Sequence, residues 1–352
     1  MEKKNVLCVN FNQDNDLIAM GTKTGFNIYM INPLSNRDCR NLEGGIGKIE
    51  MLNATNLIIF VGSGDNAQFP VNKVIIWDEA DNKTLGLLCF SGMVKNIKLT
   101  KKCIFVVCEE QVFVFRNEVF KNIGKYDSYI NPKGIFAVAP NTKINVCAYP
   151  VESEGYIEIQ KIVLEEDGSV CQNEKLPVKI KAHKSDIGFI ALNFNGTRVA
   201  TASVKGTLIR VFDTESGELL QELRRGSGEA VISSIVFSKD DKYLACASDK
   251  GTVHIFKVMP KNGNDKSSGN QKSFFGKIPL FGVEKEYFQS EWSFSQLRIN
   301  STAKKPICAF GEDNEIYVVT EDGMFYKGKF DPNSSKGSCT LLEEKALYTL
   351  TE

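Results

Sequence analysis

The sequence has few of the residues from which enzyme and metal sites are usually built. Only two of its 352 residues are histidines, and none of its ten cysteines forms a Cys-x-x-Cys pair. Serine-nucleophile and zinc-peptidase motifs are missing, and Gly44-Gly45-Ile46-Gly47-Lys48 has neither the spacing nor the following hydroxyl of a phosphate-binding loop. We therefore expect a protein that is not an enzyme and that carries no metal and no cofactor.

Net charge and long apolar runs are also lacking. The 43 basic and 43 acidic residues cancel, so no overall field attracts nucleic acid or an anionic surface. The longest strongly apolar run, Leu57 to Val61, is far below the ~18 residues of a membrane-spanning helix. Several cysteines, such as Cys103 and Cys246, lie inside apolar segments, as reduced buried thiols do. These features predict a soluble cytoplasmic protein that does not bind nucleic acid and whose anion binding is local.

Short segments in which a turn leads into an alternating apolar strand recur seven times. Their anchor residues are Phe26, Val74, Val112, Tyr156, Thr207, Thr252 and Met324. The spacing is 38 to 51 residues except for the last interval, which is 72, and roughly 40 to 50 residues make one propeller blade. No segment shows a long helical period. We predict an all-β fold, a single seven-bladed β-propeller over residues 1–352 with degenerate WD40-like repeats.

The long last interval places an insertion in the sixth blade. Its four strands are expected at Ala230–Phe237, Tyr243–Ala247, Thr252–Val258 and Glu291–Ile299, which leaves residues 258–290 as an inserted loop.

A polar cassette occurs twice, on either side of an arginine pair. Residues 201–207 (Thr-Ala-Ser-Val-Lys-Gly-Thr) and residues 246–252 (Cys-Ala-Ser-Asp-Lys-Gly-Thr) align with a shift of 45, and Arg224-Arg225 lies between them. Side chains alternate along a strand, so the two arginines are expected to serve two neighbouring pockets. Guanidinium groups match phosphate oxygens. A single cassette favours the alternative that its hydroxyls bond neighbouring backbone and its Lys-Gly forms a turn, whereas the arginine pair favours a doubled phosphate site.

The two histidines lie close to these cassettes in sequence. His183 precedes the first cassette and His254 follows the second. A lone histidine is more often structural, but this proximity favours contacts with a phosphorylated headgroup. Such contacts predict tighter binding as the pH falls toward and below about 6.5.

The arginine motif and its surroundings resemble the PROPPIN family of WIPI-type β-propellers, in the branch with Leu-Arg-Arg-Gly. Leu223-Arg224-Arg225-Gly226 carries the resemblance, together with Lys205 to Thr214 and Ser248 to Phe256, and it extends over nearly the whole chain. It implies binding of phosphatidylinositol 3-phosphate and 3,5-bisphosphate. It further implies a first site of His183, Thr201, Ser203, Lys205 and Arg224, and a second of Arg225, Ser227, Ser248, Lys250, Thr252 and His254. Recruitment as a monomer to preautophagosomal or endosomal membranes also follows from it.

The second half of the insertion is too apolar for an ordinary surface loop. Its apolar residues are Phe274, Phe275, Ile278, Leu280 and Phe281, and lysines flank them. A disordered loop fits the polar first half, whereas a bilayer interface accepts such apolar and aromatic groups. The family resemblance implies insertion of this loop into the membrane. A cover over the core and a helix formed on lipid stay open as alternatives.

A polar turn near the start of the sequence, with Asn12 and Asp14, matches the family branch's docking point for a large autophagy lipid-transfer protein. An ordinary hairpin turn explains it equally well. The remaining alternative for the whole chain is a protein-only WD40-type scaffold without lipid specificity, because a propeller fold does not by itself define a function.

Overall fold

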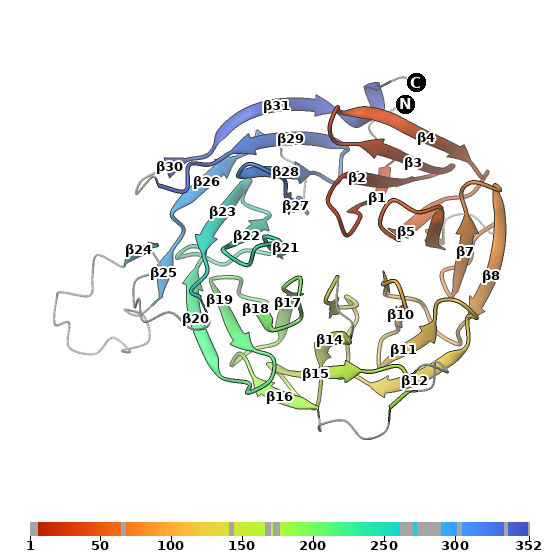
Figure 1. The fold of residues 1–352 in the computed structure, drawn as a ribbon, viewed down its shortest axis with the longest axis horizontal. Helices are drawn as coiled ribbons and strands as arrows, with labels where there is room; N and C mark the ends of the chain where they lie inside the picture. The colour runs from red at the N-terminus through yellow and green to blue at the C-terminus, as the bar shows by residue number, and fades with distance from the viewer. Residues whose placement is uncertain are drawn as a thin grey trace.

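The structure, a computed structural model, describes residues 6–64, 68–140, 144–165, 170–171, 177–260, 270–272, 290–300, 305–333 and 337–350. In this part of the chain the strands form seven sheets around a central axis, as Figure 1 shows. The prediction of an all-β, seven-bladed β-propeller is confirmed. No helix among the described residues is long and apolar enough to cross a membrane.

Each of the first five blades is built on an antiparallel sheet of four consecutive strands. The strands of blades one to three are β1 (Val6–Phe11), β2 (Leu17–Thr22), β3 (Gly25–Met30), β4 (Ser35–Asn41), β5 (Ile46–Met51), β6 (Leu57–Gly62), β7 (Lys73–Asp78), β8 (Lys83–Cys89), β9 (Asn96–Leu99), β10 (Cys103–Val107), β11 (Gln111–Arg116) and β12 (Asn122–Asp127). Those of blades four and five are β13 (Ala137–Val138), β14 (Asn145–Pro150), β15 (Tyr156–Ile162), β16 (Val178–Lys181), β17 (Ile187–Leu192), β18 (Arg198–Ser203), β19 (Leu208–Asp213) and β20 (Leu219–Arg224).

The sixth and seventh blades contain the remaining main strands and a short 3-10 helix. Blade six has β21 (Ile232–Phe237), β22 (Tyr243–Ser248), β23 (Thr252–Lys257) and β26 (Ser295–Arg298), and blade seven has β27 (Ile307–Phe310), β28 (Glu315–Val319), β29 (Met324–Lys329) and β31 (Thr340–Ala346), followed by the helix η4 (Leu347–Thr349). Besides β13, three further two-residue strands lie at blade edges: β24 (Gln271–Lys272), β25 (Glu291–Trp292) and β30 (Gly337–Ser338).

Burial follows the position of a strand within its blade. The second strands β2, β14 and β18 are buried along their whole length because neighbouring blades pack on both faces. The outer strands β8 and β12 alternate or are exposed, as expected of a rim. Between blades five and six a cluster that includes Val211, Leu244 and Phe256 also holds Leu223, which is fully buried. The residue before the arginine pair therefore anchors the end of β20 in the core.

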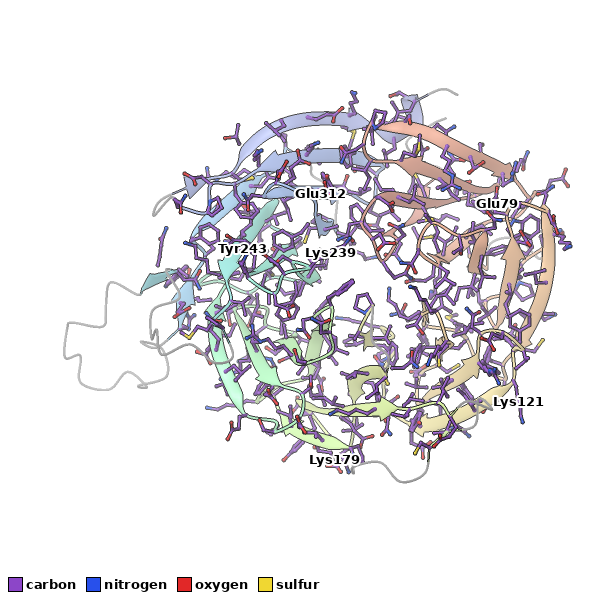
Figure 2. All side chains as sticks on the ribbon, in the orientation of Figure 1. Glu79, Lys121, Lys179, Lys239, Tyr243 and Glu312 are labelled. Carbon is purple, nitrogen blue, oxygen red and sulfur yellow. The ribbon has the colours of Figure 1, made fainter. Side chains whose placement is uncertain are left out.

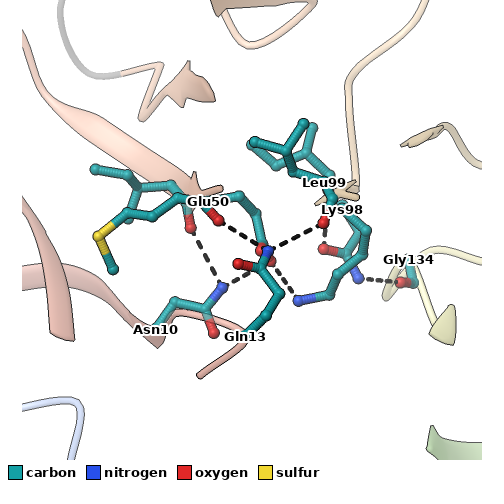
Figure 3. Close-up of polar contacts among 10 residues, drawn as sticks. Asn10, Gln13, Glu50, Lys98, Leu99 and Gly134 are labelled. Atoms are coloured by element: carbon teal, nitrogen blue, oxygen red, sulfur yellow. Dashed lines mark hydrogen bonds and ion pairs between the residues drawn. The ribbon is translucent and has the colours of Figure 1, made fainter. Parts of the chain in front are cut away.

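Polar side chains tie the innermost strands together near the axis (Figure 3). Asn10 of β1 donates to Glu50 Oε1 of β5 at 2.6 Å, and Lys98 of β9 forms an ion pair with the same carboxylate. Gln13 donates to the carbonyls of Met51 and Leu99 at 2.8 and 3.0 Å. Burial raises the pKa of Glu50, and the Lys98 ammonium opposes that shift. These contacts link the first three blades across their inner edges.

The ring closes between blades seven and one through side chains. Asn32 donates to the Tyr317 hydroxyl at 2.9 Å, and Asn15 donates to the Phe310 carbonyl at 3.0 Å. Blade seven takes all four of its main strands from one C-terminal segment. Among the described residues, no strand of the N-terminal region completes it.

The edges of blades five and six carry extra strands. β25 pairs in parallel with β20, matching Leu223 with Glu291 and Arg224 with Trp292, and β24 then pairs with β25. β30 covers the outer strand β26 of blade six in the same way. The expected fourth strand, Glu291–Ile299, is therefore wrong in its first part. Only Ser295–Arg298 pairs with β23, because the free edge of β20 takes the preceding residues.

Candidate functional site

The two arginines at the end of β20 are buried and have different partners. Each is 5% exposed. Arg224 Nε donates to the hydroxyl of Ser290 at 2.9 Å, whereas Arg225 Nε donates to the Gly206 carbonyl at 2.7 Å and its Nη2 donates to the Gly228 carbonyl. The alternation of side chains along the strand therefore sends the neighbouring guanidiniums to different surroundings.

On the blade-five side, His183 and Thr201 are in direct contact. His183 Nε2 lies 2.9 Å from Thr201 Oγ1, and both residues are buried. Ser203 ends β18 and is also buried, and Lys205 is exposed in the turn that follows. Strand pairing brings Ser203 and Arg224 to the same end of the sheet, because Ala202 pairs with Ile209 and Leu208 pairs with Arg224.

Arg210 was not among the site residues predicted from the sequence. Together with burial, the positive charge of its guanidinium lowers the pKa of His183. Arg210 pairs with Thr201 across β18 and β19 and donates to the Ala182 carbonyl at 2.8 Å and to Glu222 Oε2 at 2.9 Å. Once the β18–β19 register is drawn, the sequence places Arg210 opposite Thr201. The register of these two strands is the signal from which Arg210 could have been predicted.

On the blade-six side, the second cassette lies next to Arg225. Ser248 is buried at the end of β22, and its hydroxyl accepts from the Lys250 backbone N–H at 3.4 Å. Lys250 is exposed and its ammonium lies 3.2 Å from Asp249 Oδ2, and Thr252 is half-buried at the start of β23. Ser227 is exposed in the turn after the arginines. This hydrogen bond between Ser248 and the Lys250 backbone is the contact expected if the cassette hydroxyls bond neighbouring backbone groups.

A glycine is required in the first cassette turn. Gly206 has φ +61°, and a Cβ there would lie 2.0 Å from the Ala230 carbonyl oxygen. Gly251 has φ +68° at the same position of the second cassette. Only glycine adopts this conformation readily, so each Lys-Gly pair turns the chain and leaves an exposed lysine beside the arginine edge.

The two histidines are neutral at neutral pH. Burial lowers the pKa of His183 to about 4, and the Arg210 charge adds to that shift. Burial likewise lowers the pKa of His254 to about 4, with a further contribution from Arg225. His254 Nδ1 lies 3.0 Å from the Ser293 hydroxyl. Both rings are buried beside a cation, which accounts for the low pKa values. The expected tightening of headgroup binding as the pH falls stays a prediction.

The turn of blade one separates the two predicted docking residues. Asn12 is 2% exposed, its Oδ1 accepts from the backbone N–H groups of Asp16 and Leu17 at 3.1 Å, and its Nδ2 donates to Asp16 Oδ1 at 2.5 Å. Asp14 is more exposed and accepts from Asn53 Nδ2 at 2.7 Å. Its Oδ1 lies 3.9 Å from the ammonium of Lys239, which Figure 2 shows beside the centre of the ring. Asn12 thus holds the hairpin, and Asp14 is the more accessible of the two. A docking role for either residue stays a prediction.

Between the two ends of the insertion, the structure describes one short stretch, which lies against blade five. β23 ends at Lys257, residues 270–272 lie against β25, and the chain rejoins the blade edge at Ser290. The predicted membrane-inserting residues, Phe274, Phe275, Ile278, Leu280 and Phe281, lie outside the described residues.

The described residues include no group of three or more His, Cys, Asp or Glu side chains that could hold a metal ion. What they do present is a pair of guanidiniums flanked by hydroxyls and exposed ammonium groups. That donor set suits the oxygens of a phosphorylated ligand. Fold and site together define a seven-bladed β-propeller with a cationic edge between its fifth and sixth blades.

Known proteins share this architecture over nearly the whole chain. The PROPPIN family model matches residues 5–348. Autophagy-related protein 18e of Arabidopsis thaliana is 33% identical over 350 residues, which cover 99% of this chain and 89% of that protein. SVP1-like protein 2 of Pichia angusta is 34% identical over 321 residues, covering 89% and 87%. The solved structure of Kluyveromyces lactis Hsv2 with complete loop 6CD matches with a TM-score of 0.78 at 25% identity, covering 97% of this chain and 99% of that one.

The chain belongs to the PROPPIN family, the autophagy-related, phosphoinositide-binding β-propellers.

Proposed function

We propose that the protein is a non-catalytic effector that binds phosphatidylinositol 3-phosphate and phosphatidylinositol 3,5-bisphosphate through two sites flanking Arg224-Arg225. The observation that carries this proposal is the pair of buried, adjacent guanidiniums with different partners. A guanidinium forms charge-assisted hydrogen bonds with phosphate oxygens. Two such groups, which follow one another at the end of blade five and have different partners, support two headgroup sites.

The first site consists of Arg224 and the blade-five residues His183, Thr201, Ser203 and Lys205, to which we add Arg210 because of its place opposite Thr201. The second consists of Arg225 with Ser227, Ser248, Lys250, Thr252 and His254. Exposed Lys205 and Lys250 lie at matching cassette positions. They supply the first attraction for the phosphates, and the buried groups supply the specific contacts. Neutral histidines act as hydrogen-bonding partners and not as cations.

The insertion supplies a third contact, with the bilayer itself. Its apolar residues, Phe274, Phe275, Ile278, Leu280 and Phe281, enter the membrane interface while the two sites hold headgroups. Linking three weak contacts raises the effective concentration of each, so membrane binding is far tighter than any single contact. The neutral overall charge makes this binding depend on the phosphoinositide.

On the membrane, the protein recruits autophagy machinery, including a large lipid-transfer protein, through the Asp14 face. The recruited species is a monomer drawn from the cytoplasm to preautophagosomal or endosomal membranes rich in phosphatidylinositol 3-phosphate. The accessibility of Asp14 beside Lys239 supports this surface.

Vesicle flotation tests the proposed function. Phosphatidylcholine vesicles containing phosphatidylinositol 3-phosphate should carry the protein to the top of the gradient, and vesicles without it should not. Changing both Arg224 and Arg225 to Thr should abolish flotation. Equal flotation of the double variant would exclude the two-site proposal and favour the protein-only scaffold.

A further inference from the structure

Three buried polar side chains hold the insertion against blade five. Gln221 of β20, Asn270 and Glu291 are 5 to 8% exposed. Glu291 Oε2 accepts from Gln221 Nε2 at 2.6 Å and from Asn270 Nδ2 at 2.9 Å. We refer to these three side chains as the clasp.

The clasp also grips the backbone where the insertion leaves β23. Asn270 Oδ1 accepts from the Lys257 N–H at 2.8 Å, and its Nδ2 donates to the Lys257 carbonyl at 2.7 Å. Gln221 donates to the same carbonyl at 3.1 Å and accepts from the Met259 N–H at 3.1 Å. The exit of the insertion, a point within it and its return are thereby tied to one place on blade five.

This arrangement divides the insertion into two segments, residues 261–269 and residues 273–289. The second starts after Lys272 and ends before Ser290, which are adjacent to the paired strands β24 and β25. All the apolar residues assigned to membrane insertion belong to this second segment. The described residues on either side of it, Lys272 and Ser290, lie at the same short sheet edge.

This sheet edge lies directly beside β20, the strand that carries Arg224. β25 pairs Glu291 with Leu223 and Trp292 with Arg224, and the Ser290 hydroxyl accepts from Arg224 Nε. The clasp residue Gln221 lies three positions before Arg224 on β20. The attachment of residues 273–289 and the first headgroup site therefore share one strand.

A buried polar network in which each member has partners gives a fixed geometry, whereas an unpaired buried amide or carboxylate is costly. The clasp satisfies the Asn270 amide on both its oxygen and its nitrogen. Loss of the Asn270 side chain removes three hydrogen bonds and leaves Glu291 with fewer donors. We expect the β24–β25 pair to be held less firmly against β20 as a result, since each of these strands has only two residues.

We propose that the clasp of Gln221, Asn270 and Glu291 is a positioning device for membrane binding. It holds the described residues on either side of 273–289 against β20, the strand that carries Arg224, so that one bilayer meets the headgroup site and the inserting segment. The inference rests on the proposed function. It assigns to the clasp residues no contact with lipid. Their effect is to shorten the tether between the headgroup site and the inserting segment, which raises the effective concentration of that segment at the membrane.

Two variants and two ligands test this role. For Asn270→Ala and Glu291→Ala we expect affinity for phosphatidylinositol 3-phosphate vesicles to fall about tenfold, while affinity for soluble inositol 1,3-bisphosphate stays unchanged. Glu291→Gln retains an acceptor oxygen and should keep vesicle binding. Asn72→Ala is the matched control, because it removes a comparable hydrogen bond in blade two, from the Asn72 side-chain amide to the Phe90 carbonyl at 2.9 Å.

Unchanged vesicle affinity in both alanine variants would overturn the positioning role, as would a parallel loss of soluble headgroup binding. Failure of the unaltered protein to bind either ligand would instead overturn the proposed function. Hydrogen exchange gives a lipid-independent measurement. Residues 271–272 and 291–292 should exchange faster in Asn270→Ala than in the unaltered protein, with residues 208–213 unaffected, and equal exchange at 271–272 and 291–292 would overturn the inference.

Discussion

Asn12 and Asn193 hold equivalent turns in the first and fifth blades. Each backbone N–H donates to the carbonyl of the residue five positions later at 3.1 Å, and each Oδ1 accepts from that residue's N–H, at 3.1 Å for Asn12 and 2.8 Å for Asn193. Both side chains are buried. The residue three positions after each has positive φ, Asn15 at 60° and Gly196 at 66°. The same asparagine device therefore forms a turn in two blades, only one of which was assigned to partner docking.

Substitutions in the blade-one turn should separate stability from docking. Asn12→Ala leaves the buried Leu17 N–H without its side-chain acceptor, and we expect a loss of about 2 kcal/mol in the free energy of unfolding. Asp14→Ala should change stability much less, because its side chain is partly exposed. Urea denaturation measures the stability of both variants. Capture of an autophagy lipid-transfer protein measures docking, which we expect Asp14→Ala to weaken. A loss of capture in Asn12→Ala at full stability would contradict this division.

Single arginine variants should remove one headgroup site each. We expect calorimetry with soluble inositol 1,3-bisphosphate to show two sites in the unaltered protein and one strong site in Arg224→Thr or Arg225→Thr, the other weakened about 10- to 100-fold. Lys179→Thr, at the rim of blade four (Figure 2), is the control for loss of a positive charge. If either single variant abolished both sites, a shared pocket would replace the two-site arrangement.

The histidines should make the fold less stable in mild acid. Their folded pKa values, about 4, lie below the unfolded value of about 6.5. The unfolded chain therefore takes up protons first, and stability that is present above pH 6.5 is lost as the pH falls toward 4. At pH 5 the loss should be about 2 kcal/mol for each histidine. Urea denaturation at pH 7.5 and pH 5 should show about half of the histidine contribution in His254→Gln, and an unchanged pH dependence would contradict the assignment.

Ring closure should depend on the Tyr317 hydroxyl. It accepts from Asn32 at 2.9 Å and donates to Glu315 Oε2 at 2.8 Å, while the ring lies in the core between blades seven and one. Tyr317→Phe keeps the packing and should cost about 1–3 kcal/mol in the free energy of unfolding, because two polar groups lose a partner. Tyr129→Phe, at the half-buried rim of blade three, is the comparison variant. Equal stability of the two variants would mean that packing alone closes the ring.

The fold followed from the sequence because its signals are local. Alternating strands, glycine turns and a spacing near 45 residues define blades without reference to distant contacts. The partner of a short edge strand is a different matter. Glu291-Trp292 has the alternation of a blade-six strand, yet it pairs with β20, because the free edge of blade five lies within reach. Alternation states which face is buried and does not state which edge is used.

The same limit applies to the candidate site. Side-chain parity predicted two neighbouring pockets for Arg224 and Arg225; the structure gives the two guanidiniums different hydrogen-bond partners, and the two pockets stay a prediction. Arg210 was missed because its place beside Thr201 depends on the register of two strands. The low pKa values of His183 and His254 were missed because burial by neighbouring blades leaves no mark in the local sequence.

The four main strands of each of the first five blades come from one continuous segment, so they can pair as soon as that segment leaves the ribosome. Blade six differs, since β23 ends at Lys257 and its partner β26 starts only at Ser295. A nascent chain that has reached residue 260 thus exposes two unpaired edges at once, β23 and β20. Unpaired edges invite association with other chains. These two edges gain their partners only once residues 291–298 have been synthesised.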